Sequence, residues 1–554
     1  MPAQESNFSD RESEESSDED DHPLLSIPAL RISTRLPSPS NFTTPTSPLS
    51  PTSTVPTDYS SDRDDLEPPP PPLVLVAGFL APSWKANWGP LEELQELAIR
   101  EEASKGRWLR RRKFLYVTPG MCSSVHDRAC EIFAQLKGGI VDYGEFLIIQ
   151  ASIPNGPPLT PCISSDTHSY VLHILVPQEY PKKKKKKKKK SLKKRTPFLA
   201  NQGGPTIYKL QEFLATGFFA PAGHPDTSVD WIRSLTGLSA PFRGTTACYL
   251  LGLRPYPHPP GAVYPLSFGG VTYRTLHLYE YFVPESVRRA VYDLQLDHWN
   301  FPTHGLWKCL WRSPWAEGLD TAPYDLCVGA RWRDWERMTG SESWEKGEWR
   351  GVGQRTWYRS FATSLAIPSL LLPPFPAPTS LPKSALSLAI SLPLYLLSLL
   401  VSRHRFVPGT SAVPPAELAA ARTPFSIDPH FWHDNDGLCC VVGQYHPGAC
   451  RRCGGWDSRA PFLGEDGLGN DTEGGDNSLP CLHRRSLGSR YARYGDKGPD
   501  RAEDESKSEN EQTESPGVWY VTELAGATHL DLGLWHGSGM QKAFWADVIK
   551  WLGK

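Results

Sequence analysis

The chain has 554 residues, several times the length of a typical single domain, and its formal net charge of −2 averages parts that differ in charge. Residues 1–68 contain 14 Asp or Glu against 4 Lys or Arg, a net charge of −10, and Lys182–Arg195 supplies 12 positive charges to a remainder that is otherwise acidic. This distribution argues against a broadly basic nucleic-acid-binding protein, and a hydrophobic content of 39% with 19 Trp argues against a wholly disordered chain.

An acidic tail comes first along the chain. Residues 1–72 are rich in Ser, Thr, Pro and acidic side chains, which predicts a disordered segment ahead of a folded domain at 73–554. The first residues lack the basic and then apolar pattern of a signal peptide. Eleven cysteines are an odd and sparse set, unlike a disulfide framework. We therefore expect a cytoplasmic or membrane-associated protein in a reducing compartment.

Strand and helix patterns alternate from residue 73 onward. The expected elements are a buried strand at Leu73–Val76, an amphipathic helix at 90–106, a strand at Lys113–Val117, a helix at Asp127–Leu136 and a further helix at Pro205–Leu214. The first of these helices places Leu91, Leu94, Leu97 and Ile99 at spacings expected for one face. Alternation of this kind predicts an α/β fold with a mostly parallel central sheet and flanking helices.

Three segments interrupt the pattern. Residues 146–197 are anomalous because they end in a basic stretch with nine consecutive lysines, Lys182–Lys190, and residues 442–516 form a polar insertion. Residues 362–422 are rich in Pro and Leu, and 384–402 within them are uncharged and just long enough for a membrane span. Pro393 and several serines favour a buried or interfacial segment over a span.

The motifs of the chain, taken in order, resemble a known family. They are Ala77–Phe79, Ser123–Gly144, Gln202–Gly204, Ser239–Thr245, Tyr292–Trp299, Arg312–Pro314, Asp320–Leu326, Asn435–Gly437 and Thr528–Asp531. The chain is similar to the staphylococcal and thermoalkalophilic bacillus type of triacylglycerol lipase and to its fungal relatives. The resemblance implies an α/β-hydrolase fold, a lid at residues 246–290, and hydrolysis of triacylglycerols or other long-chain esters.

The resemblance also implies a catalytic machinery for acyl transfer. In such a site a histidine base, oriented by a carboxylate, activates a serine, and the three follow one another as serine, acid and histidine. By match, Asp436 is the acid and His529 the base. The oxyanion hole corresponds to the backbone N–H groups of Phe79 and Gln202, and backbone donors tolerate changes of side chain.

The position of the nucleophile departs from the family pattern. Aligned on the two glycines of Gln202–Gly204, the serine position holds Asn201, which cannot act as the nucleophile. One interpretation is a degenerate, non-catalytic homologue. The other is that residues 146–197 come from translation through a non-coding, A-rich stretch, as the run of lysines indicates.

The family carries a structural zinc held by two Asp and two His. Asp127 and Asp297 match the two carboxylates, but no histidine follows Gly144 where the other ligands are expected, so half of the site is missing. The family also has a calcium site, which Asp531 alone hints at in this chain.

Three hypotheses for function follow. The first is a lipase-type serine ester hydrolase that acts on a lipid or ester substrate, contacts a lipid interface and is impaired by Asn201. The second is a non-catalytic lipid- or protein-binding homologue of the same fold. The third is a membrane-anchored scaffold that uses residues 384–402 as its anchor. None of them involves a nucleic acid.

Overall fold

The residues that the computed structural model describes all belong to one compact unit, residues 67–554. They are residues 70–76, 78, 88–138, 141–143, 172–176, 203–254, 263–284, 286–288, 294, 307, 318–347, 349–365, 385–402, 434–448, 481–486, 514–532 and 539–552. Most of the predicted tail, the lysine run and most of the polar insertion lie outside these ranges.

A parallel sheet forms the centre of this unit. Its seven described strands follow the order β2-β1-β3-β4-β5-β7-β6, and each neighbouring pair runs parallel. The strands are β1 (Leu73–Val76), β2 (Phe114–Val117), β3 (Leu172–Val176), β4 (Ile232–Leu238), β5 (Trp357–Ser364), β6 (Cys481–Ser486) and β7 (Trp519–Ala525). The order reverses at β1, which lies between β2 and β3, so the fold class predicted from alternation is confirmed as α/β with a parallel sheet.

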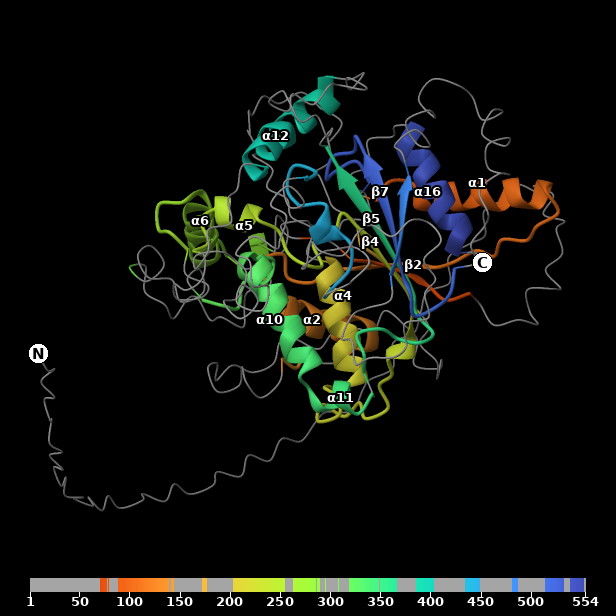
Figure 1. Cartoon of the computed structure of the whole chain (residues 1–554), viewed down its shortest axis with the longest axis horizontal. Helices are drawn as coiled ribbons and strands as arrows, with labels where there is room; N and C mark the ends of the chain where they lie inside the picture. The colour runs from red at the N-terminus through yellow and green to blue at the C-terminus, as the bar shows by residue number, and fades with distance from the viewer. Residues whose placement is uncertain are drawn as a thin grey trace, which may run out of the picture. The chain divides into compact units, whose positions relative to one another are not determined.

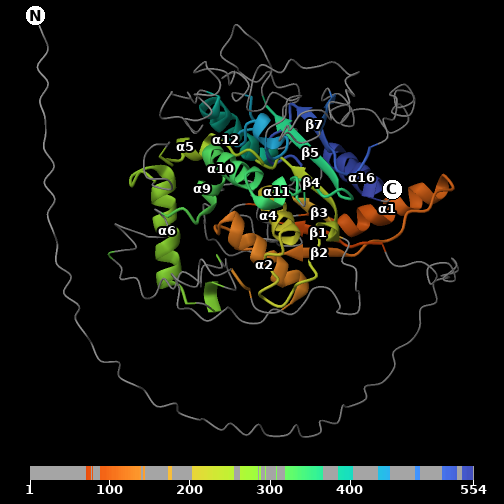
Figure 2. The same ribbon diagram turned by 60° about the horizontal axis from the view of Figure 1, so that its bottom comes forward.

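Helices cover both faces of the sheet (Figures 1 and 2). The helices α1 (Leu91–Ser104) and α16 (Gly539–Leu552) pack on one face, and α2 (Val125–Lys137), α4 (Gly203–Ala215) and α10 (Val328–Thr339) on the other. Side chains of a strand alternate between faces, so Leu73 and Leu75 join the cluster with α1 and α16, while Val74 and Val76 join the cluster with α2 and α4. The result is a three-layer arrangement.

The two helices predicted near residues 90–106 and 127–136 are present as α1 and α2, with a difference in the face of α1. Leu91 and Leu94 are buried together with Ala98, but Leu97 is 59% exposed. The spacing of Leu91, Leu94 and Ala98 follows the helical repeat, whereas Leu97 lies on the solvent side. The expectation that Leu97 shares the buried face is wrong.

Two strands lie where the sequence analysis expects none. β3 falls within the anomalous segment 146–197 and pairs with β1 and β4 in the middle of the sheet. β6 falls within the polar insertion 442–516 and pairs with β7 at the sheet edge, with Cys481 buried. Both segments therefore contribute backbone to the sheet.

Further elements surround the sheet. They are the 3₁₀ turns η3 (Val229–Trp231) and η6 (Val442–Gln444), and the helices α5 (Ala247–Leu250), α6 (Phe268–Phe282), α9 (Ala322–Asp325), α11 (Glu342–Glu345) and α12 (Ala385–Val401). The predicted lid region contains α5 and α6, which expose Leu250 and Phe268. The apolar segment 384–402 forms α12, and no helix among the described residues is long and apolar enough to cross a membrane.

Candidate active site

The loops that follow β5 and β7 meet at the carboxyl edge of the sheet. The N–H of Leu365, next after β5, donates to the carbonyl of Asn435, and the N–H of Gly526, next after β7, donates to the carbonyl of Ser364. The N–H of His529 then donates to the carbonyl of Asp436 at 2.9 Å. Neighbouring parallel strands bring their following loops to one place, which is where α/β folds bind ligands.

The Asp436 carboxylate accepts hydrogen bonds from five donors. Oδ1 accepts from the backbone N–H groups of Leu438 (3.0 Å) and Cys439 (2.8 Å), which close a tight turn. Oδ2 accepts from Thr363 Oγ1 (2.8 Å), Gln444 Nε2 (3.1 Å) and His529 Nδ1 (2.5 Å). Asp436 is completely buried, and this set of donors compensates the cost of burying its charge.

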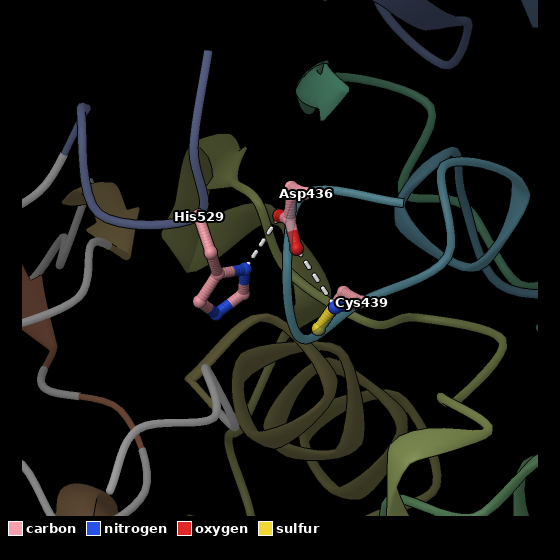
Figure 3. Close-up of side chains that lie close together, drawn as sticks. All are labelled: Asp436, Cys439 and His529. Carbon is pink, nitrogen blue, oxygen red and sulfur yellow. Dashed lines mark hydrogen bonds and ion pairs between the residues drawn. The ribbon is translucent and has the colours of Figure 1, made fainter. Parts of the chain in front are cut away.

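His529 is completely buried and faces Asp436 through Nδ1 (Figure 3). The bond fixes the tautomer with the proton on Nδ1 and leaves the lone pair on Nε2. Within the described part of the chain, Nε2 makes no hydrogen bond. A buried imidazole with an occupied Nδ1 and an open Nε2 is the arrangement of a general base that waits for a hydroxyl proton.

Three polar side chains behind Asp436 hold the carboxylate in place. Ser239 Oγ lies 2.7 Å from Thr363 Oγ1, which donates to Asp436, so these hydroxyls form a chain that ends at the carboxylate. Gln444 accepts from the backbone N–H of Thr363 through Oε1 and donates to Asp436 through Nε2. Ser239 has a φ of 52°, an uncommon conformation for a residue other than glycine. The sequence gives no signal that these three are site residues: a positive φ at a serine cannot be seen in a sequence, and Ser239 belongs to the Ser239–Thr245 motif without a role of its own.

Cys439 contributes a third potential ligand beside the pair. One ligand atom from each of Asp436, Cys439 and His529 lies within 4.8 Å of the others. The Asp436 oxygens already accept five hydrogen bonds, and a carboxylate has about four lone-pair sites. A metal ion here would have to displace these donors, so the geometry favours an acid–base pair over a metal centre.

Asn201, at the position of the missing serine, and the predicted oxyanion-hole residues Phe79 and Gln202 lie outside the described residues. The helix that follows them, α4, begins at Gly203. At Gly204 a Cβ would come within 2.5 Å of the Ala240 Cβ, so only glycine allows the first turn of α4 to pack against the loop after β4. β3, the strand before α4, ends at Val176, and residues 177–202 separate the two elements.

The candidate zinc ligand Asp127 is completely buried in the first turn of α2. Burial, with a smaller contribution from the Asp325 carboxylate, raises the pKa of Asp127 to about 7. Asp297 lies outside the described residues, and no cluster of three potential ligands in the described ranges includes Asp127. The described residues do not complete a four-ligand zinc site. Asp531, the residue linked to calcium, accepts from the Thr528 N–H and closes the turn that carries His529.

No protein-family model matches the chain, and no curated protein matches its sequence. Among solved structures, it is similar to EstA from Clostridium botulinum, at 18% identity and a TM-score of 0.46, covering 90% of this chain and 95% of that one. It is also similar to lipase 1 from Pelosinus fermentans, at 17% identity and a TM-score of 0.46, covering 87% and 98%. For the Staphylococcus hyicus lipase the identity is 15% and the TM-score 0.44, covering 87% and 95%.

Proposed function

We propose that the chain has the architecture of a lipase-type ester hydrolase of the α/β-hydrolase fold, with His529 as base and Asp436 as the carboxylate that orients it. The observation that carries the proposal is the buried 2.5 Å bond from His529 Nδ1 to Asp436, with Nε2 left open. A parallel sheet that delivers acid and then histidine from loops at its carboxyl edge supports the same assignment.

Each group has a defined task in acyl transfer. His529 Nε2 takes the proton of the attacking hydroxyl and returns it to the leaving alcohol, while Asp436 stabilises the imidazolium formed in between. Backbone N–H groups at Phe79 and Gln202 would stabilise the tetrahedral oxyanion, each contributing about 3 kcal/mol. Asn201 supplies no hydroxyl, so the chain as it stands lacks the group that attacks the ester.

The substrate class we propose is a lipid ester. Its support is the exposure of large apolar side chains on and around α5 and α6, in the predicted lid region. Leu266 is 94% exposed, and Leu250, Tyr264, Phe268 and Val271 are also exposed. Several exposed apolar side chains within one short stretch of the chain fit a region that contacts apolar ligands or interfaces.

A non-catalytic lipid- or protein-binding homologue is the second candidate. Asn201 favours it, because loss of a nucleophile costs a factor on the order of 10⁶ in kcat. The long connection between β3 and α4 favours it as well, since a nucleophile elbow is a sharp turn directly between strand and helix. Both features lie in one segment of the chain, and one reconstruction tests both.

The test is to rebuild the elbow and measure hydrolysis of nitrophenyl esters and emulsified triglyceride. In the full chain, residues 177–198 are deleted and Leu199→Gly, Ala200→His and Asn201→Ser are introduced, so that β3 leads directly into α4. We expect activity from this reconstruction and much less from Asn201→Ser alone. A reconstructed chain that is folded but inert would favour the non-catalytic homologue.

A further inference from the structure

The loop after β4 carries a completely buried arginine, Arg243, which binds His446 at two points. Its Nε donates to the carbonyl of His446 at 3.0 Å, and its Nη2 lies 2.8 Å from Nε2 of the His446 ring. The other ring nitrogen, Nδ1, lies 2.8 Å from the carbonyl of Pro447 and donates to it, so Nε2 is left to accept from the guanidinium. The planar fork of an arginine suits two acceptors placed in this way.

Arg243 also binds the residues just before His446. Its backbone N–H donates to the carbonyl of Gly443 at 2.9 Å, and its guanidinium lies 5.9 Å from the centre of the Tyr445 ring. These residues include the end of η6, a single 3₁₀ turn, and the last carbonyls of such a turn find no partners inside it. Arg243 therefore supplies donors at both ends of the 443–446 segment.

The 443–446 segment connects three parts of the sheet through consecutive side chains. Gln444 accepts from the N–H of Thr363 in β5 at 2.8 Å and donates to the carbonyl of the same residue at 3.1 Å. The Tyr445 hydroxyl donates to Glu523 Oε1 in β7 at 2.5 Å. His446 binds the loop after β4 through the arginine. The position of this segment therefore depends on all three contacts, and the arginine supplies the contact to β4.

The segment reaches the candidate acid through Gln444. Gln444 Nε2 donates to Asp436 Oδ2 at 3.1 Å, and His529 Nδ1 bonds to the same oxygen at 2.5 Å. A displacement of the segment would move the amide away from the oxygen that orients the imidazole. Misplacement of a catalytic group by about 1 Å can lower a rate by about 10²-fold, even when its cause lies far from the chemistry.

We propose that Arg243 is a positioning residue for the Asp436–His529 pair. It fixes the 443–446 segment, the segment fixes Gln444, and Gln444 fixes the carboxylate oxygen that faces His529. Arg243 takes no part in the proton transfer itself. Its effect on rate rests on the proposed function, whereas its effect on the hydrogen bond between His529 and Asp436 does not.

The experiment is proton NMR of the full-length protein, because a proton held in a short bond between a buried imidazole and a carboxylate gives a far-downfield resonance. His529→Ala identifies this resonance by removing it. Arg243→Met keeps an apolar stem and removes the donors, so we expect the resonance to move upfield and broaden. Arg128→Met is the matched control, since Arg128 in α2 is also completely buried and donates to a backbone carbonyl, that of Gly120. It should leave the resonance in place.

The rate of the chain with the reconstructed elbow gives a second readout. Arg243→Met should lower kcat for nitrophenyl esters by about 10- to 100-fold and leave KM nearly unchanged, because it disturbs the base and not the binding of the ester. Arg243→Lys should recover part of the rate and part of the resonance shift. Lysine keeps a cation that can donate to His446 but lacks the planar fork.

Circular dichroism verifies folding, and lysine variants replace the methionine variants at either arginine if those do not fold. A resonance that stays unchanged in a folded Arg243 variant would overturn the positioning role. An equal change in the Arg128 variant would overturn it as well, since the effect would then be a general loss of stability. A resonance missing from the unchanged protein would overturn both the pair and the role of Arg243. If His529→Ala leaves the rate unchanged while Arg243→Met still shifts the resonance, the proposed function fails and the positioning role stands.

Discussion

At the scale of single residues, the candidate site depends on polar groups that come from four separate segments. The Asp436 carboxylate accepts hydrogen bonds from Thr363 of β5, from Gln444 of η6 and from the backbone N–H of Leu438. It also pairs with His529, which follows β7. Every oxygen position of the carboxylate is used, so its orientation is determined by the protein and not by solvent. Removing a side chain that donates to Asp436, such as Thr363, should therefore lower stability more than removing the hydroxyl of Ser239, which bonds only to Thr363.

Thr363→Val tests this arrangement because it preserves shape and removes the hydroxyl. The change takes one donor from buried Asp436 and leaves Ser239 without its acceptor, so we expect about 1–3 kcal/mol lower unfolding free energy in urea. Ser239→Ala is the control, since it leaves the bond from Thr363 to Asp436 intact and should cost less. Equal stability of Thr363→Val and the unchanged protein would contradict the role assigned to Thr363.

Asp127 gives a prediction for pH. Its pKa is raised to about 7, so the folded chain binds more protons than the unfolded chain between about pH 4 and pH 7. The contribution of this group to the unfolding free energy is therefore largest at low pH and falls as pH rises through that window. Asp127→Asn removes the cost of ionising this buried carboxyl group, and we expect it to stabilise the protein at pH 8 by up to about 4 kcal/mol, with little change near pH 3.

The same variant tests the zinc expectation. Thermal unfolding with and without a chelator, together with metal analysis, should show less than one zinc per chain and no effect of the chelator, because the four-ligand set is incomplete. A chain that holds one zinc tightly and loses it in Asp127→Asn would show that the missing ligands lie outside the described ranges. In that case Asp127→Asn would lower stability at pH 8 instead of raising it.

At the scale of elements, α12 and the turn after Asp436 fit together through Gly437. Gly437 has a φ of 104°, and a Cβ there would come within 2.8 Å of the Leu394 carbonyl oxygen and 2.9 Å of the Leu394 Cβ. We expect Gly437→Ala to destabilise the protein by at least 1–3 kcal/mol, roughly the cost of a strained backbone, and to displace α12. Thermal unfolding and limited proteolysis within α12 measure the two effects, and a neutral substitution would show that α12 is not seated on this turn.

The elements also show how far the sequence could predict the structure. β1, α1, β2 and α2 follow from apolar runs and helical spacing, because each has a clear local pattern. β6 has the sequence Cys481–Ser486, with three charged or imidazole side chains in a row, and becomes a strand only through pairing with β7. β3 is a short apolar run whose surroundings, rich in Pro and Lys, obscure it.

The residues of the candidate site also fall into those that the sequence predicts and those that it does not. Asp436 and His529 were predicted from short motifs, and the structure brings them together, while their catalytic role stays a prediction. Thr363, Gln444 and Ser239 could not be predicted, because they meet only when β4, β5 and η6 are assembled. Leu97 was placed on the wrong face because six residues after Leu91 amount to well over one and a half helical turns.

At the scale of the whole molecule, the chain contains some of the parts that acyl transfer needs and lacks the serine at the expected position. The sheet, Asp436, His529 and α4 are in the described part of the chain. Asn201 occupies the position that the family resemblance assigns to the nucleophile, and residues 177–202 separate β3 from α4. We expect the unmodified protein to hydrolyse nitrophenyl esters negligibly, at a rate measured against buffer alone. Ordinary turnover would reveal a nucleophile other than the one the family pattern implies.

The most direct test of the central claim, that His529 and Asp436 are the base and acid of an ester hydrolase, is the hydrolysis rate of the reconstructed chain with and without His529→Ala. We predict that His529→Ala lowers kcat by roughly 10⁴-fold or more. Cys439→Ser, the neighbouring control, retains the backbone donor to Asp436 and should leave most of the rate. A reconstructed, folded chain whose rate is unchanged by His529→Ala, or is abolished by Cys439→Ser instead, would contradict the assignment.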